Sequence, residues 1–310
     1  MRLTIRIVGW MADYRMLDNM AKIVSIASGK GGVGKSVISS NLALLFTKRG
    51  KRVILTDFDT GGANQHVLFG MFHPKATMTD FLNRRFKTLE EVAQQVNGYQ
   101  NLRLIPGTGD TLRTSNLQYA KKKRLIRHLK ELETDIIIVD VGAGTHYHAL
   151  DFFLLADHHL AVATPDPTSV LDLYRFIKLS AIRKVLTSFA ARDPVAHTLL
   201  DREFQSVSEV LEAVGQTNED GVPTAEEALR DFHPHLILNR MTNGSRINTL
   251  QLQNLLKQYV GAELTLLGNI PDHESVARSV HKYLPVVDLD PASPASLALG
   301  QIADNILARL

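Results

Sequence analysis

Short apolar runs recur along this chain and alternate with longer stretches whose apolar residues are spaced three or four apart. Buried parallel strands show as short continuous apolar runs, whereas amphipathic helices show as the wider spacing. The runs that predict buried strands lie at residues 23–27, 53–59, 102–105, 135–140, 160–163, 236–238 and 264–270. Their alternation with helical stretches predicts an α/β fold, a doubly wound and mostly parallel sheet with right-handed crossovers. In such a sheet, ligands bind outside the carboxyl ends of the strands.

One connection, at about residues 183–232, is much longer than the link between a strand and a helix needs to be. It carries two capping-box patterns, at 206–209 and 224–227, and a turn pattern at 220–221. These patterns predict an inserted helical hairpin, and both a docking surface and a packing elaboration without a partner are open interpretations of it. Because no proline-rich or glycine-serine linker divides the chain, we expect residues 21–310 to form a single domain.

Both ends of the chain carry ambiguous segments. Residues 1–20 place arginines among apolar residues, but lack the continuous apolar core and the cleavage site of a signal peptide. A start assigned too far upstream, disorder, and a segment that binds a partner or a surface are the open interpretations of this N-terminal extension. Near the other end, Leu299, Ile302, Ile306 and Leu310 form an apolar stripe. The opposite face is not basic enough for a membrane helix, so we expect the stripe to pack in the core.

The most specific local pattern is Gly-Lys-Gly-Gly-Val-Gly-Lys-Ser at residues 29–36, which fits the phosphate-binding pattern G-x-x-x-x-G-K-[ST]. It follows the predicted strand at 23–27 and precedes a helical stretch at 37–46, as this chemistry requires. Backbone N–H groups of such a loop turn inward on a polyphosphate, and the helix N-terminus adds partial positive charge. ATP or ADP with Mg²⁺ is therefore the predicted ligand, with Lys35 on the β- and γ-phosphates and Ser36 on the metal. The other residues predicted to contact the nucleotide here are Gly29, Gly31, Gly32, Val33, Gly34 and Val37.

Two of the predicted strands end in aspartates. The second run ends in Asp57 and Asp59, which point the same way on an extended segment, and a flexible stretch at 60–64 follows. The fourth run ends in Asp140 with glycines behind it, which is typical of a Walker B strand that holds the metal through water. An Asp-x-Asp pair alone is more often a helix cap or a turn. The phosphate-binding loop is what favours a role in metal binding and hydrolysis.

The full string at residues 30–36 resembles the deviant Walker A loop of the MinD/ParA family of ATPases. The resemblance implies that Lys30 crosses a dimer interface to the partner's nucleotide, a solvated surface lysine being the alternative. It makes Lys30, Lys35 and Asp59 the catalytic residues. The other roles that it implies are a metal site at Ser36, Asp57 and Asp140, a water-positioning carboxylate at Asp59, and a switch-region asparagine at Asn64.

Two further segments bear on the resemblance. Residues 164–170, followed by a helical stretch, resemble the MinD and FlhG branch of the family more than the ParA branch, and residues 57–62 lack the proline-glutamine usual in ParA. By the same resemblance, four residues that follow apolar runs border the adenine, with ordinary turn chemistry as the alternative. These residues are Asn239, Arg240, Pro271 and Asp272.

Composition further narrows the classes of protein to which the chain can belong. The chain has no cysteine, which fits a reducing cytoplasm and excludes relatives with the same loop that bridge iron–sulfur clusters. A formal charge of +3 is only mildly basic. A basic stretch, 121–124 with Arg127 and Lys130, is open to contact with DNA or anionic lipid, or to a solvated helix face. Four histidines lack the spacing of metal ligands and are expected to be ordinary polar residues: His146, His148, His158 and His159.

These features predict an ATP-dependent, homodimerising switch ATPase of the MinD/FlhG type with low intrinsic turnover. We expect it in the bacterial cytoplasm, recruited reversibly to a pole, the membrane or the nucleoid, and acting through a protein partner that the sequence does not identify. No Asp-Gln-Ala activation segment of the FlhG type precedes the loop, so flagellar placement and division-site selection stay open. A ParA-like DNA-associated partitioning ATPase is one alternative. A nucleotide-bound scaffold without useful hydrolysis is the other.

Overall fold

The structure is a computed structural model that describes residues 21–59, 62, 64–107, 119–200, 202–245, 247, 249–261 and 263–310. The predicted extension at residues 1–20 lies outside these residues. The strands are β1 (Lys22–Ala27), β2 (Val53–Phe58), β3 (Gln94–Gln95), β4 (Leu102–Ile105), β5 (Ile136–Val141), β6 (His158–Ala163), β7 (His235–Met241) and β8 (Thr265–Pro271). The first helices are α1 (Lys35–Lys48), α2 (Gln65–Leu68), α3 (Met78–Leu82), η2 (Glu90–Val92), α4 (Tyr119–Lys130), α5 (Tyr147–Leu154) and α6 (Pro167–Thr187). The remaining helices are α7 (Pro194–Leu200), α8 (Val207–Thr217), η3 (Glu219–Gly221), α9 (Val222–Arg230), α10 (Thr249–Val260), α11 (Glu274–His281), α12 (Val286–Leu289) and α13 (Pro294–Leu307).

Within the described residues, the strands form one sheet in the order β3-β4-β2-β5-β1-β6-β7-β8. All neighbouring strands are parallel except β3 and β4, which pair antiparallel at one edge. The predicted doubly wound, mostly parallel sheet is confirmed, and each apolar run named above corresponds to a strand, with only residues 59, 135 and 264 falling just outside. The two-residue strand β3 was not predicted, because it is too short to leave a pattern.

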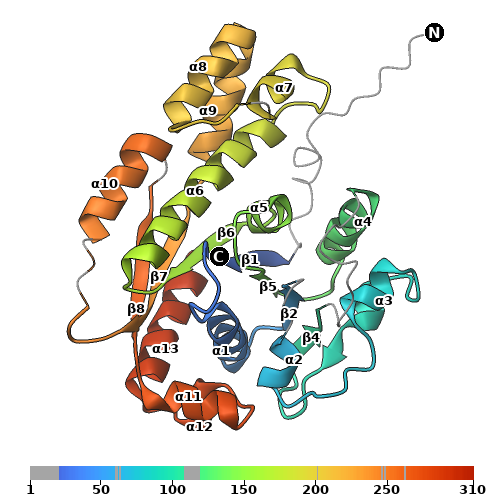
Figure 1. Cartoon of the computed structure of the whole chain (residues 1–310). Helices are drawn as coiled ribbons and strands as arrows, with labels where there is room; N and C mark the ends of the chain where they lie inside the picture. Colours follow the sequence, from blue (N-terminus) through green and yellow to red (C-terminus); the bar gives the residue numbers. More distant parts are fainter. Residues whose placement is uncertain are drawn as a thin grey trace.

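Helices cover both faces of the sheet (Figure 1). Neighbouring residues of a strand enter different apolar clusters, as Ile54 and Leu55 of β2 do, because successive side chains point to opposite faces. One cluster is closed by α4, α5, α6 and α10, and the other by α1, α12 and α13. Leu299, Ile302 and Ile306 of α13 are buried in the second cluster, so the predicted core packing of the C-terminal stripe is confirmed.

The insertion contains more helices than predicted. Helix α6 runs to Thr187, so the first residues of the predicted insertion belong to it, and α8 and α9 correspond to the predicted hairpin. Helix α7 precedes them, and the three inserted helices share an apolar cluster of their own with the end of α6. Ser206 caps α8 by accepting a hydrogen bond from the Glu209 backbone N–H at 3.3 Å.

The prediction of a second capping box at 224–227 is wrong. Helix α9 already begins at Val222, and Pro223 occupies its first turn, where a fixed φ and a missing N–H cost nothing. Thr224 therefore lies inside the helix and cannot cap it. The predicted turn at 220–221 falls in the short helix η3.

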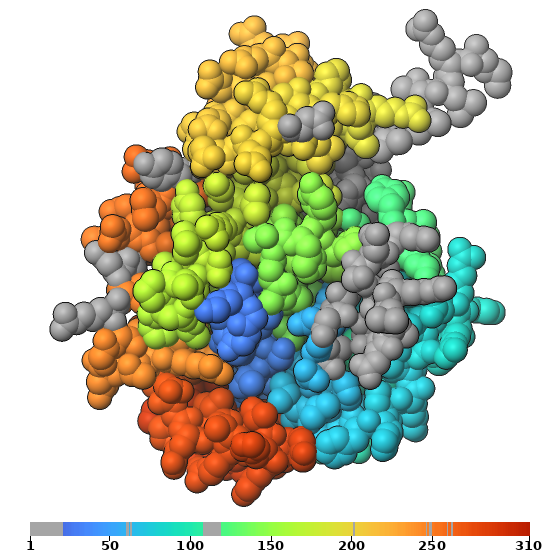
Figure 2. Space-filling view, viewed as in Figure 1, coloured from blue at the N-terminus to red at the C-terminus, as the bar shows by residue number. Residues whose placement is uncertain are grey.

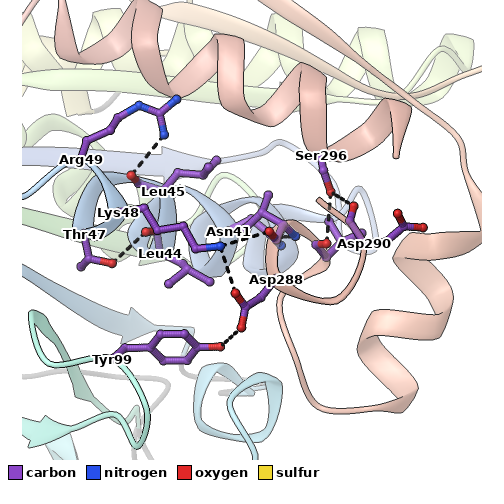
Figure 3. A network of polar contacts seen from close by, with 12 residues as sticks. Asn41, Leu44, Leu45, Thr47, Lys48, Arg49, Tyr99, Asp288, Asp290 and Ser296 are labelled. Carbon is purple, nitrogen blue, oxygen red and sulfur yellow. Dashed lines mark hydrogen bonds and ion pairs between the residues drawn. The ribbon is translucent and has the colours of Figure 1, made fainter. Parts of the chain in front are cut away.

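The C-terminal end of α1 is fastened to the segment around α12 by polar contacts (Figure 3). Lys48 Nζ lies 2.9 Å from Asp288 Oδ1, and the Tyr99 hydroxyl donates to Asp288 Oδ2 at 2.7 Å. Asn41 Oδ1 accepts from the Val287 backbone N–H at 3.0 Å. The helix that follows the phosphate-binding loop is thus held at its far end. Among the described residues, no helix combines the length and the apolar character that crossing a membrane demands.

Candidate nucleotide-binding site

Residues 29–36, the phosphate-binding loop, connect β1 to α1 at the carboxyl end of the central strand. Gly32 and Gly34 have φ of 78° and 95°, the left-handed region that residues with a side chain rarely adopt. Helix α1 begins directly after Gly34 without a side-chain cap, so its first N–H groups are available to an anion. Residues 30–32 are exposed, and Figure 2 shows the dark blue β1–α1 segment reaching the surface between α6 and the light blue residues after β2.

Two glycines of this loop are required because other elements pack against it. A Cβ at Gly29 would lie 2.1 Å from the carbonyl oxygen of Asp172 in α6. A Cβ at Gly34 would lie 2.3 Å from Nδ2 of Asn239, which donates to the Val33 carbonyl at 2.8 Å. The backbone of α6 thus leaves no room for a side chain at position 29, whereas at position 34 the left-handed φ and the Asn239 side chain disfavour one.

Asp57 and Asp140 meet beside the loop. They are directly paired in the register of β2 and β5, and both are buried. Burial and the neighbouring Asp140 carboxyl raise the pKa of Asp57 well above its ordinary value, although backbone N–H groups of Gln65 and Asp59 oppose the shift. Burial likewise raises the pKa of Asp140, against the opposing effects of Lys35 and of a hydrogen bond with Ser36. The site thus holds two crowded carboxyls with little solvent to stabilise their charges.

Asp59 lies at the edge of this pair. Its backbone N–H donates to Asp57 Oδ1 at 3.1 Å. A Cβ on Gly142 would lie 3.4 Å from Asp59 Oδ1, so the glycine after β5 leaves room for the Asp59 side chain. The Gly144 N–H donates to the Ser28 carbonyl at 3.1 Å, which ties the same glycine segment to the start of the loop. Asn64 is exposed just before α2, and three neighbours in the predicted switch lie outside the described residues: Thr60, Gly61 and Ala63.

The two lysines of the loop point to different places. Lys35 is 6% exposed and lies close enough to Asp140 to lower its pKa. The Lys30 side chain is 44% exposed, and its Nζ lies 2.8 Å from Thr168 Oγ1 and 3.4 Å from Asp166 Oδ1 at the start of α6. Only one of these cations is therefore directed at the carboxylates of its own site.

Comparison with known proteins identifies the family of this chain. Residues 24–286 match the family model of the CobQ/CobB/MinD/ParA nucleotide binding domain. The chain belongs to this family. It is 27% identical over 285 residues to the antiactivator FleN of Pseudomonas aeruginosa, covering 92% of this chain and 86% of that protein. It is 25% identical to the septum site-determining protein MinD of Escherichia coli K12, covering 93% and 92%. Over 169 residues, 53% of this chain and 55% of the relative, it is 36% identical to the flagellum site-determining protein YlxH of Helicobacter pylori.

Solved structures show the same fold. MinD of Pyrococcus horikoshii in complex with Mg-ADP superposes with a TM-score of 0.66 at 22% identity, covering 93% of this chain and 98% of that one. MinD in the MinC:MinD complex of Aquifex aeolicus gives a TM-score of 0.65 at 21% identity, covering 93% and 96%. The predicted MinD/ParA membership and P-loop fold are thereby confirmed. The family also supports the coarse assignment to nucleotide-binding ATPases.

The residues present fit a magnesium ion in this MinD/ParA-family site. Mg²⁺ prefers oxygen ligands and commonly uses one or two carboxylates. Asp57 and Asp140 are paired in neighbouring strands and Ser36 forms a hydrogen bond with Asp140, so the three residues supply such oxygens side by side. Burial raises the pKa of both carboxyls, although the nearby Lys35 opposes the shift at Asp140. A bound divalent cation would stabilise the ionised forms of these two neighbouring carboxyls.

The four residues predicted to border the adenine are brought together at the carboxyl ends of β7 and β8. Met241 pairs with Pro271, and the Asp272 N–H donates to the Met241 carbonyl at 2.8 Å. Arg240 has a φ of 55°, and Asn239 reaches the phosphate-binding loop as described. Their contact with adenine stays a prediction.

Sequence reasoning missed Gln65. Its side chain is fully buried against Ser36 and Asp140, although it stands in the first turn of a short helix. A glutamine in such a position is ordinarily solvated, so no sequence pattern marked it.

Two cations of the basic stretch in α4, and His146 among the four histidines, have local structural roles. Lys122 forms an ion pair with the buried Asp151, and Arg124 donates to the Phe81 carbonyl at 2.6 Å and stacks on that ring. For Lys122 and Arg124, the interpretation as part of a solvated helix face is therefore wrong. His146 caps α5 by accepting from the Ala149 N–H. Within the described residues, no group of acidic or histidine side chains has the arrangement of a separate metal site.

Proposed function

We propose that this protein is an ATP-dependent, homodimerising switch of the MinD/FlhG type, which hydrolyses ATP to ADP and phosphate and controls the placement or assembly of a partner protein. The observation that carries the proposal is the divergence of Lys30 and Lys35 within one loop. Lys35 faces its own carboxylates, whereas Lys30 is half-exposed at the start of α6. A cation held beside a phosphate loop but turned away from it is suited to the phosphates of a second copy.

Each chain would divide the work among a few residues. The N–H groups of the loop and the start of α1 hold the phosphates, and Lys35 adds charge to the β- and γ-phosphates. Asp59, with room beside Gly142, orients the attacking water. Mg²⁺, held by Ser36, Asp57 and Asp140, would neutralise charge on the phosphates. Lys30 from the partner copy would complete the charge compensation, so that hydrolysis depends on dimerisation.

The names of the relatives support the type of task. They are an antiactivator, a flagellum site-determining protein and septum site-determining proteins, and one solved neighbour was crystallised as a MinC:MinD complex. Each name describes action on another protein or assembly. We therefore propose a protein partner that binds one nucleotide state, in a bacterial cytoplasm, with reversible recruitment to a pole, the membrane or the nucleoid.

The experiment compares wild type, Asp59→Ala and Lys30→Ala by analytical ultracentrifugation and phosphate release, each with ADP, with ATP and with a non-hydrolysable ATP analogue plus Mg²⁺. Wild type should be monomeric with ADP and dimeric with the analogue. Asp59→Ala should remain dimeric with ATP, because it cannot complete hydrolysis. Lys30→Ala should bind the analogue and stay monomeric. A wild type that remains monomeric under every condition contradicts the proposal.

Two added measurements separate the alternatives. Salt-sensitive binding of random DNA by the ATP-bound dimer alone would identify a ParA-like partitioning ATPase. Dimerisation without any phosphate release, even with the native partner present, would identify a nucleotide-bound scaffold. We expect neither result, since the segments at 57–62 and 164–170 resemble the MinD and FlhG branch.

A further inference from the structure

Gln65 joins three separate parts of the nucleotide site. It is the first residue of α2, it directly follows Asn64, and its side chain is fully buried. Its Nε2 donates to Asp140 Oδ2 at 2.8 Å and to the Ser36 carbonyl at 3.0 Å, while its backbone N–H donates to Asp57 Oδ2 at 3.0 Å. One residue therefore bonds to both carboxylates of the site and to the phosphate-binding loop.

These contacts fix which way the amide faces. A glutamine amide nitrogen has two hydrogens, and here both face oxygens, one of the Asp140 carboxyl and one of the Ser36 backbone carbonyl, which can only accept. A flipped amide would set its oxygen against these two oxygens. The placement of Nε2 is thus determined by chemistry, and the placement of Oε1 follows from it.

Oε1 has no hydrogen-bond partner within the described residues, although it is buried. Leaving a buried acceptor unpaired is unfavourable, and most such atoms in folded proteins find a protein group or a bound water. In the described part of the chain, the other buried side-chain atoms that lack a partner belong to residues that form no hydrogen bond with Asp57 or Asp140. The unpaired acceptor therefore belongs to the residue that is bonded to the crowded carboxyls.

We infer that Gln65 is a positioning residue of the divalent-cation site: its amide nitrogen orients Asp140 and the loop, and its amide oxygen accepts a hydrogen bond from a water bound to the cation. Mg²⁺ keeps several of its waters in protein sites, and these waters are strong donors. The inference rests on the proposed function, because it takes Ser36, Asp57 and Asp140 as the residues that hold the cation. Groups that orient metal ligands commonly change metal affinity 10–100-fold when they are removed.

The position of Gln65 also gives it a mechanical role. It links the metal ligands to the first turn of α2 and, through Asn64, to the segment that begins at Asp59. An occupied cation site would satisfy Oε1 and hold α2 against β5 more firmly.

The test uses Gln65→Met, which keeps the length of the side chain and removes both its donor and its acceptor. ADP affinity is measured by calorimetry with and without Mg²⁺, because the ratio of the two isolates the contribution of the cation. We expect the Mg²⁺-dependent gain, which is the ratio of the two affinities, to fall by about tenfold, whatever part of the metal-free ADP affinity is lost with the contact to the loop. A gain equal to that of wild type would overturn the inference.

The matched control is Gln94→Met. Gln94 in β3 is the same residue type, and both ends of its amide are paired, with the Ala76 carbonyl at 2.7 Å and the Lys75 N–H at 2.8 Å, away from the carboxylates. This variant should keep the full Mg²⁺-dependent gain. An equal loss in both variants would show a general effect of losing a hydrogen-bonded glutamine amide and would also overturn the inference.

Gln65→Glu gives a second readout that requires no nucleotide. An oxygen would replace the nitrogen that faces Asp140, and the added repulsion should lower the melting temperature in chelator and make Mg²⁺ more stabilising than in wild type. A melting temperature that Mg²⁺ raises no further than in wild type speaks against the role of Gln65, even if the methionine variant does not fold. Asp140→Asn separates failure of the role of Gln65 from failure of the metal site itself. If wild type gains nothing from Mg²⁺ and Asp140→Asn behaves identically, the metal site of the proposed function has failed instead.

Discussion

Lys30 and Lys35 belong to one short loop but lie in different surroundings. Lys35 is buried near Asp140, and Lys30 contacts Asp166 and Thr168, which are far from it in the sequence. The difference arises because Lys35 begins α1 and faces the interior of the site. Lys30 precedes the turn of the loop, where residues 30–32 are exposed. The two side chains should therefore be separable by mutation.

Lys35→Ala should abolish tight nucleotide binding. Losing a charged hydrogen-bond donor to phosphate costs about 3 kcal/mol, or roughly a 100-fold loss in affinity. Fluorescent ATP-analogue binding to the monomer measures it. Lys30→Ala is the control within the same loop and should bind the analogue as wild type does. Comparable losses in both variants would show that Lys30 serves its own nucleotide, contrary to the proposal.

The crowded carboxyls predict a link between pH and Mg²⁺. The pKa values of Asp57 and Asp140 are raised in the folded state, so these groups favour folding at low pH and lose that contribution as pH rises through the folded pKa values. A cation replaces the lost protons. The rise in melting temperature on adding Mg²⁺ should therefore be larger at about pH 8 than at about pH 5. An Mg²⁺ effect that does not depend on pH would contradict this account of the site.

Among single residues, the sequence predicted those that belong to a pattern of neighbouring positions in the chain. The loop at 29–36 and the strand-end aspartates are local patterns, and the structure brings Lys35, Asp57 and Asp140 together as their strands predict. The contacts of Asn239 with Val33, and of Lys30 with α6, join residues distant in the chain. They depend on how strands and helices pack, which no local pattern encodes.

At the scale of elements, Asp151 joins three helices. This residue of α5 is buried, forms an ion pair with Lys122 of α4, and accepts from Arg183 of α6 at 2.7 Å. Burial alone would raise the pKa of Asp151, but hydrogen bonds and charge from Arg183 and Lys122 hold it below its ordinary value. Helix α5 follows the glycine segment at 142–144 in the chain. The contacts of Asp151 therefore connect the helix behind that segment to α4 and α6.

Asp151→Asn should destabilise the protein by about 3 kcal/mol, because it leaves two poorly solvated cations without their carboxylate. Urea unfolding followed by circular dichroism measures the change. The control is Asp304→Asn, which removes a carboxylate that is 63% exposed and pairs with Arg49 on the surface. That change should cost less than about 1 kcal/mol. Equal effects would mean that Asp151 contributes no more than a surface pair.

The positions of strands and helices were predictable where an apolar run is bounded by residues that end a strand or helix, such as glycine and proline. The positions of helices inside the insertion were less predictable. There, helices of similar polarity follow one another, and capping patterns compete for the same turn. Pro223 decided that competition by starting α9 ahead of Thr224. Helix α7 left no distinctive pattern, since its burial depends on the end of α6 and on α8.

At the scale of the whole molecule, α6 connects the site to the insertion. Its first turn holds the partners of Lys30, its second turn passes over Gly29, and its last turns enter the apolar cluster of α7, α8 and α9. Figure 1 shows these inserted helices standing at the end of α6 opposite to α13. A change in the contacts of Lys30 would therefore act on a helix whose other end carries the insertion.

The amino ends of β6 and β7 contain histidines that should make global stability sensitive to acid. His159 is buried between the rings of Phe153 and Phe232. Burial, assisted by the nearby cations Lys184 and His158, lowers the pKa of His159 to about 3, and burial lowers the pKa of His235 to about 4. The unfolded chain binds these protons near pH 6.5, well before the folded protein does. Acid therefore favours unfolding throughout the window between these values.

The contribution of these histidines to stability should accordingly be fully present above about pH 6.5 and should fall by about 1.4 kcal/mol per pH unit for each histidine as pH decreases through that window. Replacing His159 by Phe keeps an aromatic ring between its neighbours and removes the titrating group. Subtracting its urea stability from that of wild type cancels the opposite contribution of Asp57 and Asp140, which both proteins share. The exposed His197, changed to Gln, is the control and should leave the pH dependence unchanged. If His159→Phe loses stability in acid as steeply as wild type, another group causes the acid sensitivity, because the buried imidazole is the only titrating group that this variant lacks.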